Sequence, residues 1–369
     1  MKSPEYPSNP ASVSITGTGV FAATGDLDVA LWAAIATRLS CGRPVPGLTV
    51  PAIDQGMEQA YFAPIAALPE QLKSHFRIPV MAKEALSQAC AALPEDRVGL
   101  RILLLTLLPV SSPERPNTEE LDHNELATAL RETHPALAMA EVRFATADEG
   151  ATSHLANCIE ELSKGEWDAL LFGGADSLTD RGTVRAYAAR GLCCTDRHPE
   201  GILPGEGAAY LLLEKSDAAR PALALIAGLG HDLEENTGKA SNSRMTALTV
   251  AIEQALAQAQ CKASQVQSIV LPMGNDIPSA LEWYQVQLKL WSDEEVDQSE
   301  MEELFPQSAI GDTGAASLPL AFIAGCARFE FNFSPAEKVL VCEVGRGKAR
   351  GAVFLEKSAT SSRPSNRVI

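Results

Sequence analysis

Positive charge is scarce in this sequence of 369 residues. Lysine and arginine together number 30, against 47 aspartates and glutamates, which gives a formal net charge of −17 at pH 7. A surface of that sign repels the phosphates of nucleic acids and the headgroups of anionic lipids. We therefore expect no nucleic-acid partner and no binding to an anionic membrane surface.

Long apolar runs are also missing. No window approaches the roughly 20 consecutive apolar residues that a membrane-spanning helix needs. The first residues, MKSPEYPSNPAS, contain no apolar core of the kind that secretory signal peptides carry. The sequence therefore predicts a cytoplasmic protein without a membrane span.

Recognisable metal-binding patterns are absent as well. The six histidines are scattered, and the eight cysteines show none of the C-x-x-C spacing typical of zinc sites. Cys193 and Cys194 are adjacent, so they could not easily share one tetrahedral metal, and a reducing compartment disfavours disulfides. We expect no metal and no cofactor, and we expect most cysteines to be small buried hydrophobic residues.

What the sequence does contain is an alternation of apolar strands and amphipathic helices, which predicts a layered α/β fold. A faint repeat divides it, because SVSITGTGVFAATG and the later ALALIAGLGHDLEENTG each read as a strand closed by glycines. We predict similar halves at 13–215 and 216–357, flanked by disordered Pro/Ser-rich tails at 1–12 and 358–369. Residues 338–357 predict a β-hairpin.

The stretch that begins at Val142, VRFATADEGATSHLANCIEELSKGEWDALLFGGADS, has the strand–turn–helix pattern that positions a catalytic nucleophile. A strand, a turn and an amphipathic helix lead to a second strand, and the helix N-terminus would lower the pKa of a thiol at the turn. The turn holds instead a poor nucleophile, Asp148, followed by Glu149. We expect Asp148 to cap the helix after it, and we expect His154 and Cys158 on that helix to pack rather than react.

These segments, in this order, resemble the β-ketoacyl synthases of the thiolase-like superfamily. The resemblance covers most of residues 13–357, and the segments that carry it are SVSITGTGVFAATG, GGADSL, GILPGEGAAYLLLEKS at 201–216 and SAIGDTGAAS at 308–317. It implies a five-layer αβαβα sandwich built from the two similar halves. It also implies a dimer formed through the strand and helix around the nucleophile turn.

The catalytic positions of that family hold a cysteine, two histidines and a lysine, and all of them are changed here. The matching residues, in that order, are Asp148, Met273, Asp312 and Gln307. Methionine donates no hydrogen bond, and an ionised carboxylate would repel the enolate that forms when a malonyl thioester loses carbon dioxide. The resemblance therefore implies a protein that neither condenses nor decarboxylates malonyl groups.

The loop that closes the family's acyl pocket is changed too. Its gating phenylalanine is matched by Arg346, and Lys348 and Arg350 follow. We expect these cations to pair with Asp148 and Asp312 and to fill the former pocket, because buried charges are costly unless they are paired. The remaining residues expected in this pocket are Glu149 and Thr313.

The function implied by this resemblance is that of a catalytically inactive β-ketoacyl-synthase-like protein. We expect a chain-length-factor-like partner of an active ketosynthase in fatty-acid or polyketide biosynthesis. It would be a heterodimer or a homodimer, with acyl carrier protein as a further partner. Two alternatives stay open. One is an adaptor that uses the fold as a protein-binding surface, and the other is an enzyme with new carboxylate chemistry at Asp148, Glu149 and Asp312.

Overall fold

The computed structural model describes most of the chain between Val13 and Ser358. The described ranges are 13–51, 56–93, 99–113, 115, 118–216, 220–234, 245–274, 276–292, 301–331, 336–345 and 347–358. The tails predicted at the two ends lie outside these ranges, apart from Ser358, which is buried. Across the part of the chain that the structure describes, no helix combines the length and apolarity needed to cross a membrane.

Ten of the twelve described strands form one large mixed sheet in the order β10-β9-β11-β12-β8-β1-β7-β6-β4-β5. It consists of two five-stranded parts, because β1 and β8 pair over only three residues, Val13–Ile15 with Ala224–Ile226. The first part contains β1 (Val13–Ala22), β4 (Ile102–Leu108), β5 (Glu141–Thr146), β6 (Ala169–Ser177) and β7 (Glu206–Lys215). The second part contains β8 (Ala224–Leu233), β9 (Ser268–Val270), β10 (Glu302–Leu304), β11 (Lys338–Glu343) and β12 (Ala349–Lys357).

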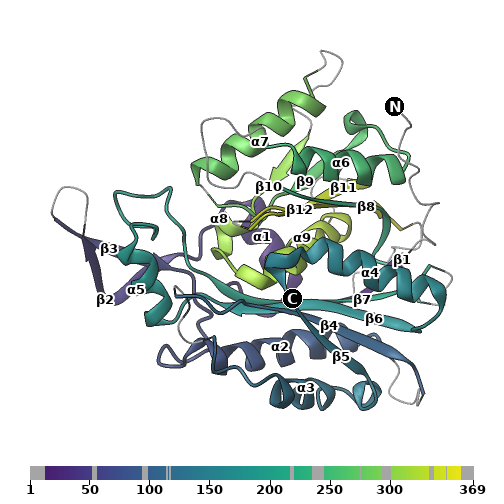
Figure 1. The fold of residues 1–369 in the computed structure, drawn as a ribbon, viewed down its shortest axis with the longest axis horizontal. Coiled ribbons are helices and arrows are strands. Elements are labelled where there is room, and N and C mark those ends of the chain that lie inside the picture. The colour runs from purple at the N-terminus through teal and green to yellow at the C-terminus, as the bar shows by residue number, and fades with distance from the viewer. Residues whose placement is uncertain are drawn as a thin grey trace.

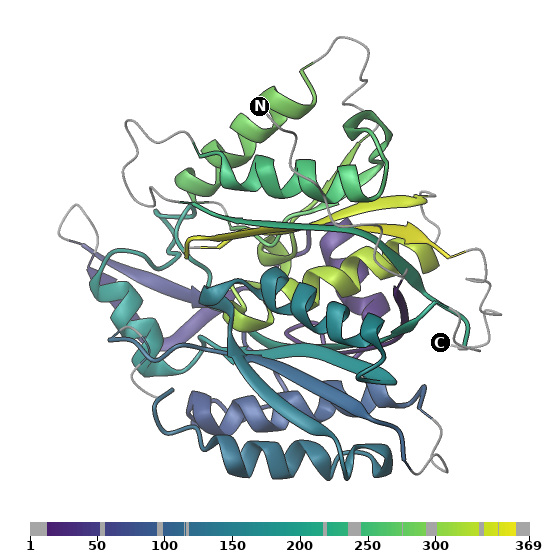
Figure 2. The ribbon, with the colours of Figure 1, turned by 45° about the vertical axis from the view of Figure 1, so that its right-hand side comes forward.

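Helices lie outside and between these two parts, which gives five layers (Figures 1 and 2). One outer layer is formed by α2 (Ser74–Cys90) and α3 (His123–Arg131), and the other by α6 (Ala247–Gln258) and α7 (Ile277–Leu290). The middle layer contains α1 (Asp28–Ala36), α4 (Ala151–Lys164) and α9 (Ser317–Glu330), and α8 (Pro306–Ile310) contacts α1 and α9. The predicted layered α/β sandwich is confirmed.

Helix α9 shows how sequence and layer agree. Its residues from Leu318 to Phe329 are all buried, because the helix packs against strands of both sheet parts. A helix with water on one side would need a polar face. The sequence SLPLAFIAGCARFE has almost none, so it fits the middle layer.

The glycine repeat seen in the sequence has a packing role in both halves. A Cβ added at Gly19 of β1 would lie 1.9 Å from the carbonyl oxygen of Ala85 in α2. A Cβ at Gly230 of β8 would lie 2.1 Å from the carbonyl oxygen of Ala251 in α6. Each half therefore uses glycine to bring an outer helix directly onto the strand backbone.

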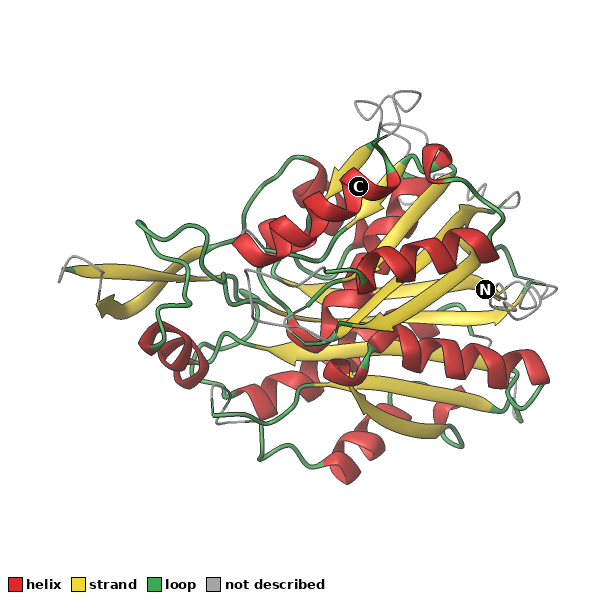
Figure 3. Ribbon diagram, turned by 45° about the horizontal axis from the view of Figure 1, so that its top comes forward, coloured by secondary structure: helices red, strands yellow, loops and turns green. Residues whose placement is uncertain are grey.

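Two further features complete the architecture. The predicted hairpin at 338–357 is confirmed, because β11 and β12 pair antiparallel. A separate two-stranded sheet, β2 (Arg43–Pro51) with β3 (Met57–Phe62), projects from the body of the molecule (Figure 3). It packs its apolar side chains against α5 (Arg181–Ala189).

Candidate functional site

The predicted nucleophile turn is present, but Asp148 does not cap the helix. Strand β5 runs into a short 3-10 turn, Ala147–Glu149, and α4 begins after Gly150, whose φ of 102° only glycine adopts easily. Gly150 occupies the N-cap position and no N-cap side chain bonds to the helix. The Asp148 side chain is exposed and has no hydrogen-bond or ion-pair partner among the described residues. The expected cap was wrong because α4 begins at Ala151, so the residue at the N-cap position is Gly150 and Asp148 lies two residues before it.

The helix N-terminus is satisfied by Glu343, the last residue of β11. Its Oε1 accepts a hydrogen bond from the backbone N–H of Ala151 at 2.7 Å, and its Oε2 accepts one from Thr152 at 2.8 Å. The Glu343 side chain is buried. A carboxylate at a helix N-terminus is stabilised by the unpaired N–H groups and the helix dipole. The position that would activate a thiol is thus already occupied by an internal anion.

Sequence reasoning missed Glu343 because the contact joins residues 192 positions apart. The available signal was a glutamate within the apolar run KVLVCEVG, since a buried carboxylate needs hydrogen-bond donors. Nothing in the sequence says which donors these are.

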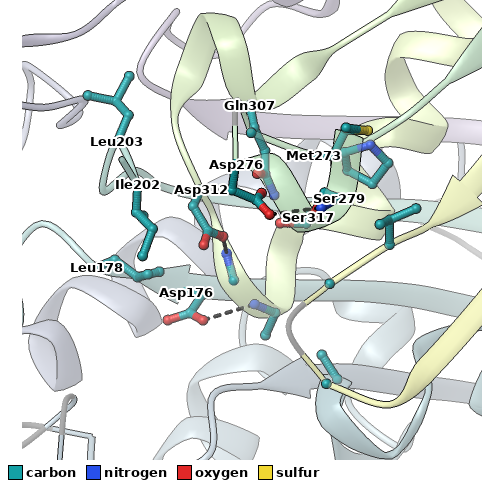
Figure 4. Close-up of a pocket in the computed structure, with 18 of the residues that line it drawn as sticks. Asp176, Leu178, Ile202, Leu203, Met273, Asp276, Ser279, Gln307, Asp312 and Ser317 are labelled. Atoms are coloured by element: carbon teal, nitrogen blue, oxygen red, sulfur yellow. Dashed lines mark hydrogen bonds between the residues drawn. The ribbon is translucent and has the colours of Figure 1, made fainter. Parts of the chain in front are cut away.

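One cavity of about 530 Å³ is lined by all four residues that the sequence resemblance assigned to catalytic positions: Asp148, Met273, Gln307 and Asp312. Figure 4 shows Met273, Gln307 and Asp312 around it, together with Asp276 and Ser317. The wall opposite them is apolar and includes Leu178, Ile202 and Leu203. The mixture of apolar walls and a few polar groups is typical of ligand pockets.

Asp312 is held by its own turn. Its Oδ1 accepts a hydrogen bond from the backbone N–H of Gly314 at 2.9 Å. Its backbone N–H donates to Leu203 at 2.7 Å and its carbonyl accepts from Gly205 at 2.8 Å. These bonds fasten the turn to the segment just before β7. Thr313 beside it is buried, and its hydroxyl lies 3.1 Å from that of Ser317 at the start of α9.

The expected ion-paired filling of the pocket is not found for the two cations that can be placed. The side chain of Lys348 is exposed and has no ion pair within the described ranges. Arg350 is buried and donates to Glu282 of α7 at 2.7 and 3.0 Å, so its partner is neither Asp148 nor Asp312. Arg346 lies outside the described residues. Glu149 is exposed and faces His154 at 3.5 Å.

A buried ion pair that the sequence did not predict lies at the cavity wall. Arg115 donates to both carboxylate oxygens of Asp176 at the end of β6, with one of the two bonds at 2.9 Å. Asp176 also accepts from the backbone N–H of Ala315 at 2.9 Å and of Ser177 at 2.7 Å. Burial lowers the pKa of Arg115, but the Asp176 carboxylate outweighs it and leaves the pKa raised. The guanidinium therefore stays charged.

A second buried network fixes the backbone around the cavity. Glu206, from the Gly-Glu-Gly-Ala segment, accepts hydrogen bonds from Arg77 at 2.5 and 2.6 Å. It also accepts from the Ser177 hydroxyl at 2.8 Å, the Thr179 hydroxyl at 2.7 Å and the backbone N–H of Ile65 at 2.7 Å. Because the carboxylate is fully partnered, it is a structural group that ties α2, β6 and β7 together.

The described residues around the cavity offer little for acyl transfer. No histidine lines it in the described ranges, and its one cysteine there is Cys194. Burial, with smaller contributions from Asp196 and Glu200, raises the pKa of Cys194, so this thiol stays protonated at neutral pH. Burial also raises the pKa of Cys158 to about 12. In the part of the chain described, no group of three or more His, Cys, Asp or Glu residues could hold a metal ion.

The chain is similar in structure to ketosynthases and chain length factors. The ishigamide ketosynthase/chain length factor has a TM-score of 0.75 at 17% identity, covering 95% of this chain and 100% of that one. A type II PKS acyl-carrier protein in complex with its ketosynthase, AntDE:AntF, has a TM-score of 0.75 at 15% identity, with 95% and 100% covered. A β-ketoacyl synthase from Burkholderia phymatum STM815 has a TM-score of 0.69 at 16% identity, with 94% and 100% covered.

Comparisons of sequence add nothing to this, since no protein-family model and no curated protein matches the chain. Identities of 15–17% establish a shared fold and leave the activity open. The layers, the nucleophile turn and the likeness to these structures agree with the resemblance seen in the sequence. This chain has the thiolase-like fold of the β-ketoacyl synthases.

Proposed function

We propose that this protein is a catalytically inactive relative of the β-ketoacyl synthases that acts as a chain-length-factor-like partner of an active ketosynthase. Its pathway would be fatty-acid or polyketide biosynthesis. Solved structures similar to it include ketosynthase/chain length factor proteins, and one is a complex with an acyl-carrier protein. Acyl carrier protein is therefore a further partner in this proposal.

The observation that carries the loss of activity is the occupied N-terminus of α4. A condensing enzyme needs a thiolate there, stabilised by the helix. Here Glu343 accepts from Ala151 and Thr152, and the sequence resemblance assigns the position of the nucleophile to Asp148. A carboxylate that attacked a thioester would form an acyl anhydride, which is a high-energy product.

A carboxylate enzyme is the weaker alternative. Acid and base roles need two carboxyl groups whose environments differ and which face one substrate. Asp148 and Glu149 are both exposed, and Asp312 already accepts from its own turn.

Strand β5 supports pairing with another ketosynthase-like chain. It is the last strand of the sheet order, so within the described residues it pairs with β4 alone. An open strand edge can accept another strand. The resemblance to the ketosynthases implies dimerisation at this strand and at α4, and both elements are intact.

The test is affinity purification of the tagged protein from its own host at native expression, with mass spectrometry of the proteins that accompany it. A roughly equimolar active ketosynthase would support the proposal and identify the pathway. A homodimer alone, or a complex with a protein outside lipid metabolism, would overturn it in favour of the adaptor alternative.

The loss of catalysis has its own test. The purified protein is incubated with acyl thioesters and with malonyl thioesters. Intact-mass spectrometry then looks for an acyl adduct, and a coupled assay looks for released carbon dioxide. We expect neither. A covalent adduct or carbon dioxide release above a no-protein control would refute the inactive assignment even if a ketosynthase partner is found.

A further inference from the structure

Helix α7 exposes a line of large apolar side chains. Ile277, Leu281, Tyr284 and Leu288 are 63%, 47%, 57% and 52% exposed. Their spacing of i, i+4, i+7 and i+11 places them on one face of the helix. We call these four residues the α7 stripe. Single exposed apolar residues are ordinary, but a contiguous row of them marks an interaction site.

The outward position of the stripe is fixed by the opposite face of α7. Glu282 is buried and pairs with Arg350 of β12 at 2.7 and 3.0 Å. Trp283 is buried and its Nε1–H donates to Glu303 at 2.9 Å. The helix cannot rotate about its axis to cover the stripe without breaking these bonds. Figure 2 shows α7, in green, on the outer side of the molecule.

The stripe carries no charge in a protein whose net charge is −17. Pro278, Ala280 and Gln285, which are exposed residues of α7 beside the stripe, are uncharged. The nearest exposed charge on α7 is Lys289, whose Nζ lies 3.5 Å from Glu253 of α6. No exposed carboxylate of α7 itself therefore adjoins the stripe, while the half-buried Asp276 precedes Ile277 and Glu253 of α6 lies beside Lys289.

We propose that the α7 stripe binds the α7 stripe of a second copy of this chain, with the two helices antiparallel. The intervals between the four residues are four, three and four, which read the same from either end. In an antiparallel pair Ile277 therefore lies opposite Leu288 of the partner subunit, and Leu281 opposite Tyr284 of the partner subunit. This is the self-complementarity that a two-fold interface requires. The intervals are also those of the a and d positions at which paired helices interlock.

This contact goes beyond the proposed ketosynthase partnership and leaves room for it. In Figure 1, α7 lies at the top of the molecule and β5 lies in its lower half. Stable interfaces bury about 1,200–2,000 Å² in total, and one pair of helices of this length covers less. We therefore expect reversible association, which strengthens with added salt because salt screens the repulsion between two acidic chains.

The test is sedimentation velocity over a series of protein concentrations, with Leu281→Glu compared with Leu39→Glu. Leu39 is 63% exposed and follows α1, so it is not part of the α7 stripe and its variant is the matched control. We expect Leu281→Glu to weaken the concentration-dependent step at least about tenfold, while Leu39→Glu behaves like wild type. A smaller assembly formed through β5 would persist in both. Wild type without such a step, or equal behaviour of the two variants, would overturn the proposal.

A charge exchange tests the antiparallel register. Ile277→Glu and Leu288→Lys should each weaken association, whereas the double variant places Glu opposite Lys in both symmetric contacts. We expect the double variant to associate at least about threefold more tightly than either single variant, which is the recovery that an exposed ion pair provides. Disruption by each single variant without recovery in the double variant would refute the antiparallel arrangement.

Discussion

Replacing Glu343 by alanine removes two hydrogen bonds and one charge from the N-terminus of α4. The carboxylate accepts from Ala151 and Thr152 at 2.7 and 2.8 Å and is buried. Hydrogen bonds to charged groups contribute about 1.5–3 kcal/mol each, and a charge at a helix N-terminus adds about 0.3–1 kcal/mol. Because these contributions overlap, we expect Glu343→Ala to lower the free energy of unfolding by about 3–5 kcal/mol.

The assay is urea denaturation followed by circular dichroism, with thermal unfolding as a second measurement. A loss of this size should lower Tm by roughly 4–6 °C in a chain of this length. Glu343→Gln keeps one acceptor oxygen but turns an amide N–H toward a backbone N–H, so it should lose about half as much. Glu337→Ala, at an exposed glutamate close to the same strand, should stay within about 0.5 kcal/mol of wild type. If Glu343→Ala matches this control, Glu343 does not hold the helix.

The remaining predictions concern the nucleophile turn, the glycine packing and acid stability. Asp148→Cys should be alkylated by iodoacetamide with the pH profile of an ordinary thiol. Adding Glu343→Gln to the same chain should shift this profile to lower pH by about 0.2–0.7 units, because it removes the carboxylate charge from the helix N-terminus. Identical profiles of the single and double variants would contradict this. Gly19→Ala should lower the free energy of unfolding, measured by urea denaturation, by more than about 2 kcal/mol, because its Cβ would lie 1.9 Å from the backbone of α2. Gly345→Ala should leave this free energy unchanged, because nothing lies within 4 Å of its Cβ. The hydrogen bond from Arg143 lowers the pKa of Glu161 below its ordinary 4.5, so this carboxylate stabilises the fold above that pH and loses its contribution as pH falls. Glu161→Gln should be less stable than wild type at pH 7 and approach it in acid, and a constant difference would refute the assignment.

The layers of the fold were predictable because they rest on local patterns. The alternation of strands and helices, the glycine repeat and the hairpin at 338–357 each depend on neighbouring residues, and the structure contains all of them. The turn at Asp148 was located by the same reasoning. The residue that caps α4 was not predictable in this way, because Glu343 lies 192 residues further along the chain than Ala151.

Charge pairing was the part that sequence reasoning could not supply. Arg350 was expected to face the cavity, yet it pairs with Glu282 of α7. Arg115, in a segment with the composition of a polar loop, pairs with Asp176 instead of staying in solvent. Which of 47 carboxylates a given cation meets depends on tertiary geometry. Helical periodicity would predict that the regular row of apolar residues on α7 is buried. In the structure this row is exposed, and the opposite face of the helix is held by the buried ion pair between Glu282 and Arg350.

The distance along the chain between α4 and its cap has a consequence for synthesis. The N–H groups of Ala151 and Thr152 leave the ribosome 192 and 191 residues before Glu343. At translation rates of about 5–20 residues per second, that interval lasts roughly 10–40 s. Once Lys215 has completed β7, and until Glu343 is made 128 residues later, the nascent N-terminal half has all five of its strands but an uncapped central helix, whose free N–H groups can bind an anion from the surroundings. The N-terminus of α4, in the first half of the fold, is therefore capped only after β11 of the second half has been made.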